Sequence, residues 1–178
     1  MYKTIKKLSL IVIFFIGVSN YTLQAQNTVK EVNTSNVYTA ENPGWLVNLD
    51  EAYALSRKTG KPIMANFTGS DWCGWCKKLT ASVFSQPEFK AWAEKNVVLL
   101  ELDFPRRKEL PENIRVQNSN LQQAFQVGGY PTVWVFDLEK NEALNNYNVS
   151  ALGKTGYLPT VAEFTTGVDQ MLAQRKKI

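Results

Sequence analysis

The only two cysteines of the chain lie three positions apart, at the junction between a predicted strand and a predicted helix. Residues 62–68, PIMANFT, form a short and nearly continuous apolar run, which is typical of a buried strand. Residues 74–84 have the apolar spacing of a helix that starts soon after it. Cys73 and Cys76 therefore mark the entrance to this helix, and any fold considered for the chain must place a thiol pair there.

Predicted strands and helices alternate along most of the chain. Strands are expected where short apolar runs occur, at 62–68, 97–103 and 132–136, with an edge strand at 45–47 and a hairpin partner at 144–149 as further candidates. Helices are expected where apolar residues recur at helical spacing, at 48–60, 74–84, 87–95, 121–125 and 160–177. This order predicts an α/β domain, built in layers around a sheet with a parallel central portion.

Two basic segments are interpreted as parts of the solvated surface. Residues 104–117 contain two prolines and are expected to form a long loop, which suggests a role because long loops without structure are uncommon. Its basic run, at 106–108, is interpreted as a solvated segment that biases which substrates approach. The basic run at 175–177 is interpreted as a complement to the dipole of the last helix.

The first 25 residues have the layout of a secretory signal peptide. Lys3, Lys6 and Lys7 precede an apolar run at 8–18, and Ala25 is a small residue suited to the cleavage position. The apolar run has eleven residues, whereas a transmembrane helix needs about 20. We therefore expect export to the periplasm or the extracellular space, with a membrane-tethered form as the alternative. The expected parts are a signal peptide at 1–25, a flexible leader at 26–44 and one domain at 45–178.

Composition excludes several classes of function. The whole chain has a net charge of +4, but loss of the three lysines of the signal peptide leaves +1. A net charge of +1 does not indicate a nucleic-acid or acidic-membrane partner. The chain contains no histidine, which excludes Ser-His-Asp and Cys-His catalysis, His-ligated haem and most zinc sites. We expect neither a cofactor nor a metal site.

Three interpretations of Cys73-Gly74-Trp75-Cys76 compete. Half of a structural zinc site is disfavoured, because such a site needs about four Cys or His ligands. A structural disulfide is disfavoured, because closing so short a loop restricts the unfolded chain by only about 2 kcal/mol. A redox pair agrees best with the position of the two thiols at a strand-to-helix junction.

A cysteine at the start of a helix has the surroundings of an attacking sulfur. Cys73 meets free backbone N–H groups and the positive end of the helix dipole, which favour its thiolate and lower its pKa. Cys73 is therefore expected to attack a substrate disulfide, and Cys76, one turn further, to resolve the mixed disulfide. The negative charge of Asp71 opposes this effect on the pKa, and Lys77 and Lys78 partly offset that charge.

The motifs around the cysteines resemble those of the thioredoxin superfamily. FTGSDWCGWCKKL, together with LELDFPRR and GYPTVWVFD, is similar to the secreted bacterial thioredoxin-like proteins in particular, and the resemblance covers residues 45–177. It implies a thioredoxin fold, in which a central mixed β-sheet is flanked by helices. It also implies thiol–disulfide oxidoreductase activity on protein disulfides.

The resemblance also implies roles for residues around the cysteine pair. The proline that matches Pro131 is cis in that family and packs beside the disulfide, and Tyr130 before it would offer its backbone to an extended substrate segment. The alternative is that these two residues form a simple turn into a strand. Trp72 and, to a lesser degree, Trp75 are expected to form an apolar docking surface, with core packing as the alternative. The expected substrate-binding residues are Trp72, Gly74, Trp75, Tyr130 and Pro131.

Proton transfer is where the chain departs from the family pattern. Thioredoxins carry a buried aspartate on the strand before the motif, which assists the resolving step, and this chain has Asn66 at that place. The usual partner lysine falls near Leu99 or Leu100. Water, Asp71 or Glu101 is therefore expected to take over this role. The dipeptide between the cysteines also differs from that of thioredoxin, so the strongly reducing potential of thioredoxin is not expected to carry over.

The leading hypothesis is a thiol–disulfide oxidoreductase that acts as a monomer on protein thiols and disulfides, in the reductase or isomerase direction. A reductase in an oxidising compartment needs a membrane electron donor. The rival hypothesis is a thioredoxin-fold binding module with an inert disulfide, which holds a secreted or envelope partner.

Overall fold

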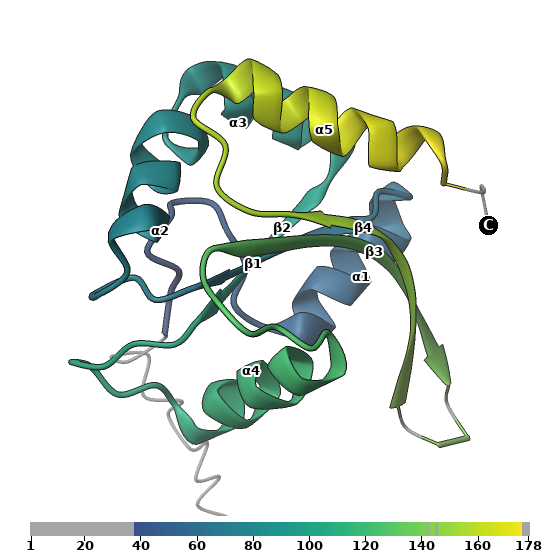
Figure 1. Ribbon diagram of the computed structural model, residues 1–178. Helices are drawn as coiled ribbons and strands as arrows, with labels where there is room; N and C mark the ends of the chain where they lie inside the picture. The colour runs from purple at the N-terminus through teal and green to yellow at the C-terminus, as the bar shows by residue number, and fades with distance from the viewer. Residues whose placement is uncertain (1–37, 142, 145, 176–178) are drawn as a thin grey trace, which may run out of the picture. The chain divides into compact units, whose positions relative to one another are not determined.

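The computed structural model describes residues 38–141, 143–144 and 146–175. The predicted signal peptide, most of the predicted leader and the last three residues lie outside these ranges. The described residues form a four-stranded sheet with helices on both faces (Figure 1). This arrangement confirms the predicted mixed sheet flanked by helices.

The sheet has the strand order β2-β1-β3-β4, and its strands are β1 (Ile63–Thr68), β2 (Val98–Asp103), β3 (Thr132–Asn141) and β4 (Asn146–Thr155). β1 runs parallel to β2 and antiparallel to β3, and β3 and β4 form an antiparallel hairpin. The predicted hairpin is confirmed, whereas the parallel portion is limited to one strand pair. The candidate edge strand at 45–47 is reduced to a single bridge between Leu46 and Leu100.

The helices are α1 (Leu49–Thr59), α2 (Gly74–Leu79), which continues as the π-helix η2 (Thr80–Phe84), α3 (Pro87–Asn96), α4 (Glu112–Ala124) and α5 (Val161–Ala173). α3 and α5 cover one face of the sheet and α1 and α4 the other, while α2 starts near the end of β1 (Figure 1). No helix in this part of the chain has the length and apolar character needed to cross a membrane.

β1 is buried on both faces, which explains its continuous apolar run. Met64 points into the core formed with α2, η2, α3 and α5. The odd-numbered residues of the strand point into the second core, formed with α1 and α4: Ile63, Ala65 and Phe67. Because side chains alternate along a strand, Asn66 and Thr68 share the face of Met64. Two polar side chains therefore lie on the face that α2 covers.

The loop predicted at 104–117 is shorter than expected, because α4 occupies its second half. The buried positions of α4 are Ile114, Asn118 and Leu121. Because one of these three residues is polar, the sequence of α4 does not show a complete helical pattern of apolar residues. Asn118 is tolerated in the interior because its Nδ2 donates a hydrogen bond to the Asp103 carbonyl at 3.0 Å.

The end of the predicted leader packs against β2. Asn42 is buried, and its backbone N–H and its Nδ2 donate to the Glu101 carboxylate at 3.1 and 2.6 Å. The backbone N–H of Glu41 donates to the same carboxylate at 2.7 Å. These contacts hold this segment in place, so the folded domain begins before residue 45.

Arg175 does more than complement the dipole of α5, and the interpretation of this residue as a simple dipole partner is wrong. Its Nε and Nη2 donate to the Asp137 carboxylate at distances from 2.7 to 3.1 Å. Its Nη1 donates to the Gly60 carbonyl at 2.8 Å. Arg175 thus joins the end of α5 to β3 and to the end of α1, while Lys176 and Lys177 lie outside the described residues.

Candidate active site

The two cysteines form a disulfide at the start of α2. Cys73 is the N-cap residue of that helix, and its Sγ accepts a hydrogen bond from the backbone N–H of Cys76 at 3.2 Å. An N–H group in this place favours the thiolate of Cys73 once the pair is reduced. Cys73 is 6% exposed and Cys76 is 3% exposed. Both cysteines are thus buried in the disulfide form, and the attacking role of Cys73 stays a prediction.

The segment before β3 lies against the disulfide. The peptide bond between Tyr130 and Pro131 is cis, as the family resemblance implies. The carbonyl oxygen of Tyr130 lies 3.7 Å from the Sγ of Cys73. The backbone of Tyr130 is thus beside the sulfur, where an extended substrate segment would meet it.

Trp72 is half-buried in an aromatic cluster beside the cysteines. Its Nε1 donates to the Phe104 carbonyl at 2.8 Å, and its ring lies edge-on to Tyr130 with 5.9 Å between centroids. Phe104 stacks on Tyr130 at 5.1 Å. Phe104 was not among the predicted site residues, although it directly follows a strand parallel to β1. Parallel strands end at the same edge of a sheet, and that was a signal for its place near the cysteines.

Gly69 is a second residue that was not predicted. A Cβ at this position would lie 2.5 to 2.8 Å from three ring atoms of Trp72, closer than real contacts allow. Gly69 is therefore required for the position of the Trp72 ring. Gly74 differs, because a Cβ there would have no atom within 4 Å. Gly74 therefore faces open space.

Trp75 is 56% exposed and is not a core residue. The Trp75 ring contacts the Tyr157 ring with 4.9 Å between centroids, and the Nζ of Lys78 lies 4.4 Å from the centroid of the Trp75 ring. Trp72 was expected to dock substrates more than Trp75. Trp72 is half-buried and thus the less exposed of the two, and the docking role of both stays a prediction.

The backbone of the 104–111 loop is held against the site, whereas the side chains of Arg106 and Arg107 are exposed, as predicted for a solvated segment. Asp71 accepts hydrogen bonds from the backbone N–H groups of Arg106, at 3.1 Å, and Arg107, at 2.6 Å. Desolvation alone would raise the pKa of Asp71, but these hydrogen bonds outweigh it and lower that pKa. The Arg106 guanidinium lies 3.7 Å from the centroid of the Trp72 ring.

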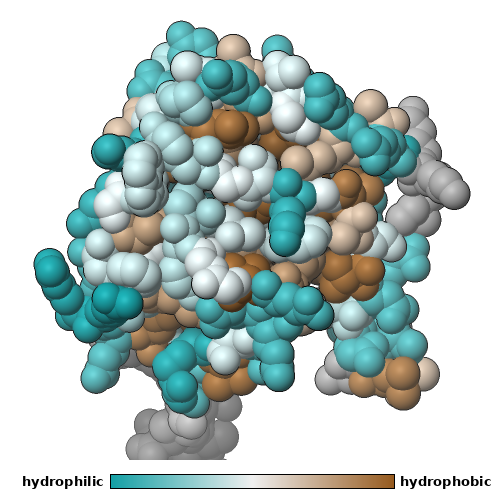
Figure 2. All heavy atoms as spheres, in the orientation of Figure 1, coloured by the Kyte–Doolittle hydropathy of each residue, from teal (hydrophilic) through white to brown (hydrophobic). Residues whose placement is uncertain are grey.

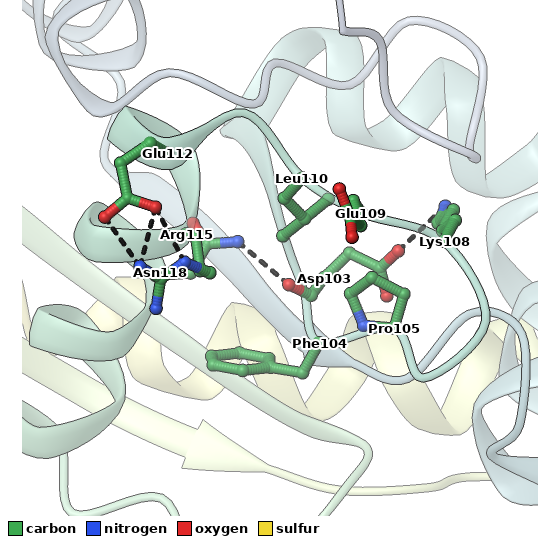
Figure 3. Close-up of a pocket in the computed structure, with 9 residues that line it drawn as sticks. All are labelled: Asp103, Phe104, Pro105, Lys108, Glu109, Leu110, Glu112, Arg115 and Asn118. Atoms are coloured by element: carbon green, nitrogen blue, oxygen red, sulfur yellow. Dashed lines mark hydrogen bonds and ion pairs between the residues drawn. The ribbon is translucent and has the colours of Figure 1, made fainter.

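Lys108 anchors the same loop to the end of β2. Its Nζ lies 2.9 Å from the carboxylate of the buried Asp103 and also pairs with Glu41. Desolvation lowers the pKa of Lys108, but the hydrogen bonds to these two carboxylates outweigh it and raise that pKa. Lys108 and Asn118 both meet Asp103 at a pocket of about 420 Å³ between the loop and α4 (Figure 3). This pocket is built around the contacts that hold the loop.

Comparison with known proteins agrees with this geometry. A family model described as thioredoxin-like matches residues 44–137, which is more than half of the chain. The chain belongs to the thioredoxin-like family.

Relatives of this thioredoxin-like chain carry names from disulfide chemistry. It is 38% identical to the disulfide bond reductase DsbH of Chlamydia pneumoniae over 89 residues, which are 50% of this chain and 54% of the relative. It is 29% identical to the thioredoxin-related protein DsbJ of the same organism over 109 residues, 61% of this chain and 30% of the relative. The chain thus spans about half or less of the length of these curated relatives. A solved structure of a DsbH oxidoreductase matches 79% of this chain and 94% of its own, with 29% identity and a TM-score of 0.63.

Four buried polar residues of this thioredoxin-like chain lie on the sheet face that α2 covers. The register pairs Asn66 and Thr68 of β1 with Glu101 and Asp103 of β2. Asn66 is 2% exposed, and its Oδ1 has no hydrogen-bond partner in the described part of the chain. Asn66, which the resemblance sets at the place of the family's buried aspartate, is thus buried, with a carboxyl group on the adjacent strand.

Glu101 and Asp71, the two carboxyl groups considered for proton transfer, are both held by hydrogen bonds. Burial raises the pKa of Glu101, and the hydrogen bonds from Glu41 and Asn42 offset this only in part. Cys76 borders a surface pocket of about 290 Å³ whose lining includes Glu41 and Asn42. The pocket thus connects the second cysteine with the segment that holds Glu101. Asp71 is occupied with the backbone of the 104–111 loop.

The raised pKa of Glu101 predicts that stability depends on pH. The folded state keeps the Glu101 proton to a higher pH than the unfolded chain, whose ordinary pKa is 4.5, so the free energy of unfolding falls as the pH rises above 4.5. Urea unfolding of the wild type and Glu101→Gln at about pH 4 to 8 measures this effect. Just above pH 4.5, the free energy of unfolding of the wild type is expected to fall more steeply with pH than that of Glu101→Gln. Equal slopes in the two proteins would contradict the prediction.

Proposed function

We propose that the protein is a thiol–disulfide oxidoreductase that exchanges protein disulfides through Cys73 and Cys76. One observation carries the proposal: the two cysteines close a disulfide in the first turn of α2, with the Tyr130 carbonyl oxygen 3.7 Å from the Cys73 sulfur. The name of the relative DsbH, a disulfide bond reductase, supports the same class of reaction.

The geometry supports a two-step exchange. In the reducing direction, the Cys73 thiolate attacks one sulfur of a substrate disulfide, the substrate S–S bond breaks, and the first substrate thiolate leaves and takes up a proton. Cys76 then loses its proton and attacks the Sγ of Cys73, which releases the second substrate thiol. Two electrons pass to the substrate, and the cysteine pair returns to the disulfide form of the structure.

The resolving step requires that Cys76 lose a proton, and the amide of Asn66 cannot accept one. The surface pocket beside Cys76 gives this thiol a route for proton exchange with water. Glu101, whose pKa is raised by burial, is the carboxyl group suited to relay the proton. The substrate segment lies along Tyr130, and its surrounding contacts are Trp72, Gly74, Trp75 and Pro131.

We place this activity outside the cytoplasm, after removal of the predicted signal peptide. An oxidising compartment keeps the cysteine pair as a disulfide, so a reductase or isomerase there depends on a membrane electron donor that reduces it again. The name of the relative DsbH favours the reductase direction. A monomer is sufficient, because one chain supplies both cysteines and the docking surface.

The second candidate function is a redox-inert binding module, which Asn66 supports because an amide cannot relay a proton. A Cys76→Ser variant separates the two functions. Without the resolving thiol, the enzyme is expected to accumulate mixed disulfides between Cys73 and its substrates. Reduced Cys76→Ser is incubated with oxidised insulin and examined on non-reducing gels, with the double variant Cys73→Ser/Cys76→Ser as control. If Cys76→Ser forms no more adduct than the control, the binding module is the better assignment.

A further inference from the structure

Four exposed cations lie on the two segments beside Cys73, and two of them contact its neighbouring tryptophans. The Arg106 guanidinium lies 3.7 Å from the ring centroid of Trp72, and the Nζ of Lys78 lies 4.4 Å from that of Trp75. Arg107 follows Arg106 in the same loop. These residues form the basic rim: Lys77, Lys78, Arg106 and Arg107.

The basic rim is not neutralised by neighbouring carboxylates. Within the described residues, none of its cations forms a salt bridge with an Asp or Glu side chain. Lys77 donates to the backbone carbonyl of Asp71, and the Asp71 carboxylate is bound by backbone N–H groups of the 104–111 loop. Asp71 still offsets part of this positive charge, since the charge of Arg107 helps to lower the pKa of its carboxyl group.

The excess of positive charge is local. The chain without its predicted signal peptide has a net charge of +1, so the four positive charges of the basic rim exceed the net charge of the chain. Hydrophilic side chains project from the end of the molecule where α2 begins, on the left of Figure 2. Exposed charges of one sign at a reactive centre raise the local concentration of ligands of the opposite sign.

We infer that the enzyme prefers protein disulfides in which acidic residues flank the reactive cysteine. The inference rests on the proposed function and names its substrate class. A segment that places its cysteine on Cys73 brings the neighbouring side chains toward Trp72 and Trp75, each of which carries a cation over its ring. An Asp or Glu side chain there pairs with Arg106 or Lys78, whereas a Lys or Arg side chain meets a like charge.

Three symmetric peptide disulfides test the preference. Each joins two copies of Ala-X-Cys-X-Ala, where X is Glu, Gln or Lys. The rate constant for reduction by the reduced protein at neutral pH is divided by that for dithiothreitol, which corrects for the intrinsic reactivity of each peptide. At low ionic strength the Glu peptide is expected to react about 5-fold faster than the Gln peptide, and the Lys peptide more slowly by a similar factor. At 1 M salt, where the Debye length is about 3 Å, the differences are expected to shrink below about 2-fold.

Charge variants locate the source of the preference. Arg106→Gln is expected to lower the ratio of the Glu to the Gln rate, and Arg106→Glu to reverse it. Arg57→Gln is the matched control, because it removes one exposed cation from α1, which precedes β1, whereas Cys73 follows that strand.

Two results would overturn the inference. One is equal wild-type rates for the Glu and Gln peptides at low ionic strength, and the other is the same loss of preference in Arg57→Gln as in Arg106→Gln. Failure of the proposed function is a distinct result, in which the wild type reduces none of the three peptides, and the inference then fails with it.

Discussion

Replacement of Cys73 by serine is expected to lower the catalysed rate of insulin reduction about 1,000-fold or more. Cys73 is the sulfur beside the Tyr130 carbonyl, and it accepts the hydrogen bond from the Cys76 N–H. A serine hydroxyl is of similar size and accepts the same hydrogen bond, but it is not ionised near neutral pH and cannot exchange disulfides. The fold is therefore expected to persist while the nucleophile is lost. Insulin turbidity with dithiothreitol as electron donor measures the reaction.

Cys76→Ser is the matched control for this experiment, because it removes the other half of the disulfide and keeps the attacking thiol. Both variants lose the same cross-link, so a difference between them reports on chemistry and not on stability. Cys76→Ser is expected to react once with insulin and then to release it slowly. A folded Cys73→Ser protein with the wild-type rate would remove the catalytic role of Cys73.

A helix or strand could be predicted from the sequence where the contacts that set its burial and its ends come from its own residues. β1 is a continuous apolar run because both of its faces are covered. α1 begins where Asn48 accepts a hydrogen bond from the Glu51 N–H, and it ends where Gly60 takes a left-handed conformation with φ of 70°. The start of α4 lacks such a signal, since its N-cap residue Pro111 makes no side-chain cap hydrogen bond, and Asn118 interrupts its apolar pattern with a side chain that bonds to the end of β2. Tertiary contacts of this kind leave no periodic pattern in a sequence.

In the candidate site, too, some residues could be predicted from the sequence and others are placed by tertiary contacts. Cys73 and Cys76 could be predicted because they are neighbours in the chain, and Pro131 because the family resemblance supplied it. Gly69 and Phe104 could not be assigned in this way, because both act through the Trp72 ring, whose position depends on the pairing of β1 with β2. Burial is equally invisible in a sequence, so the difference in exposure between Trp72 and Trp75 could not be predicted.

Arg175→Met is expected to lower the free energy of unfolding by about 3 kcal/mol, which raises the unfolding equilibrium constant about 150-fold. Asp137 is buried, with 8% of its side chain exposed, and Arg175 binds its carboxylate through two nitrogens. Methionine retains the apolar stem of arginine but leaves the buried carboxylate without its cation, and such an unpaired buried charge is strongly destabilising. Urea unfolding of the oxidised protein at neutral pH measures the change.

Arg115→Met provides the comparison that isolates burial. Arg115 also binds a carboxylate, that of Glu112 at 2.6 Å, but the two side chains are 62% and 72% exposed. Exposed pairs contribute little because water solvates both charges, so this variant is expected to lose less than about 1 kcal/mol. Asp137→Asn/Arg175→Met is expected to recover part of the stability lost in Arg175→Met, because it leaves no unpaired charge inside the protein. If Arg175→Met and Arg115→Met lose the same stability, the buried pair does not anchor α5 to β3.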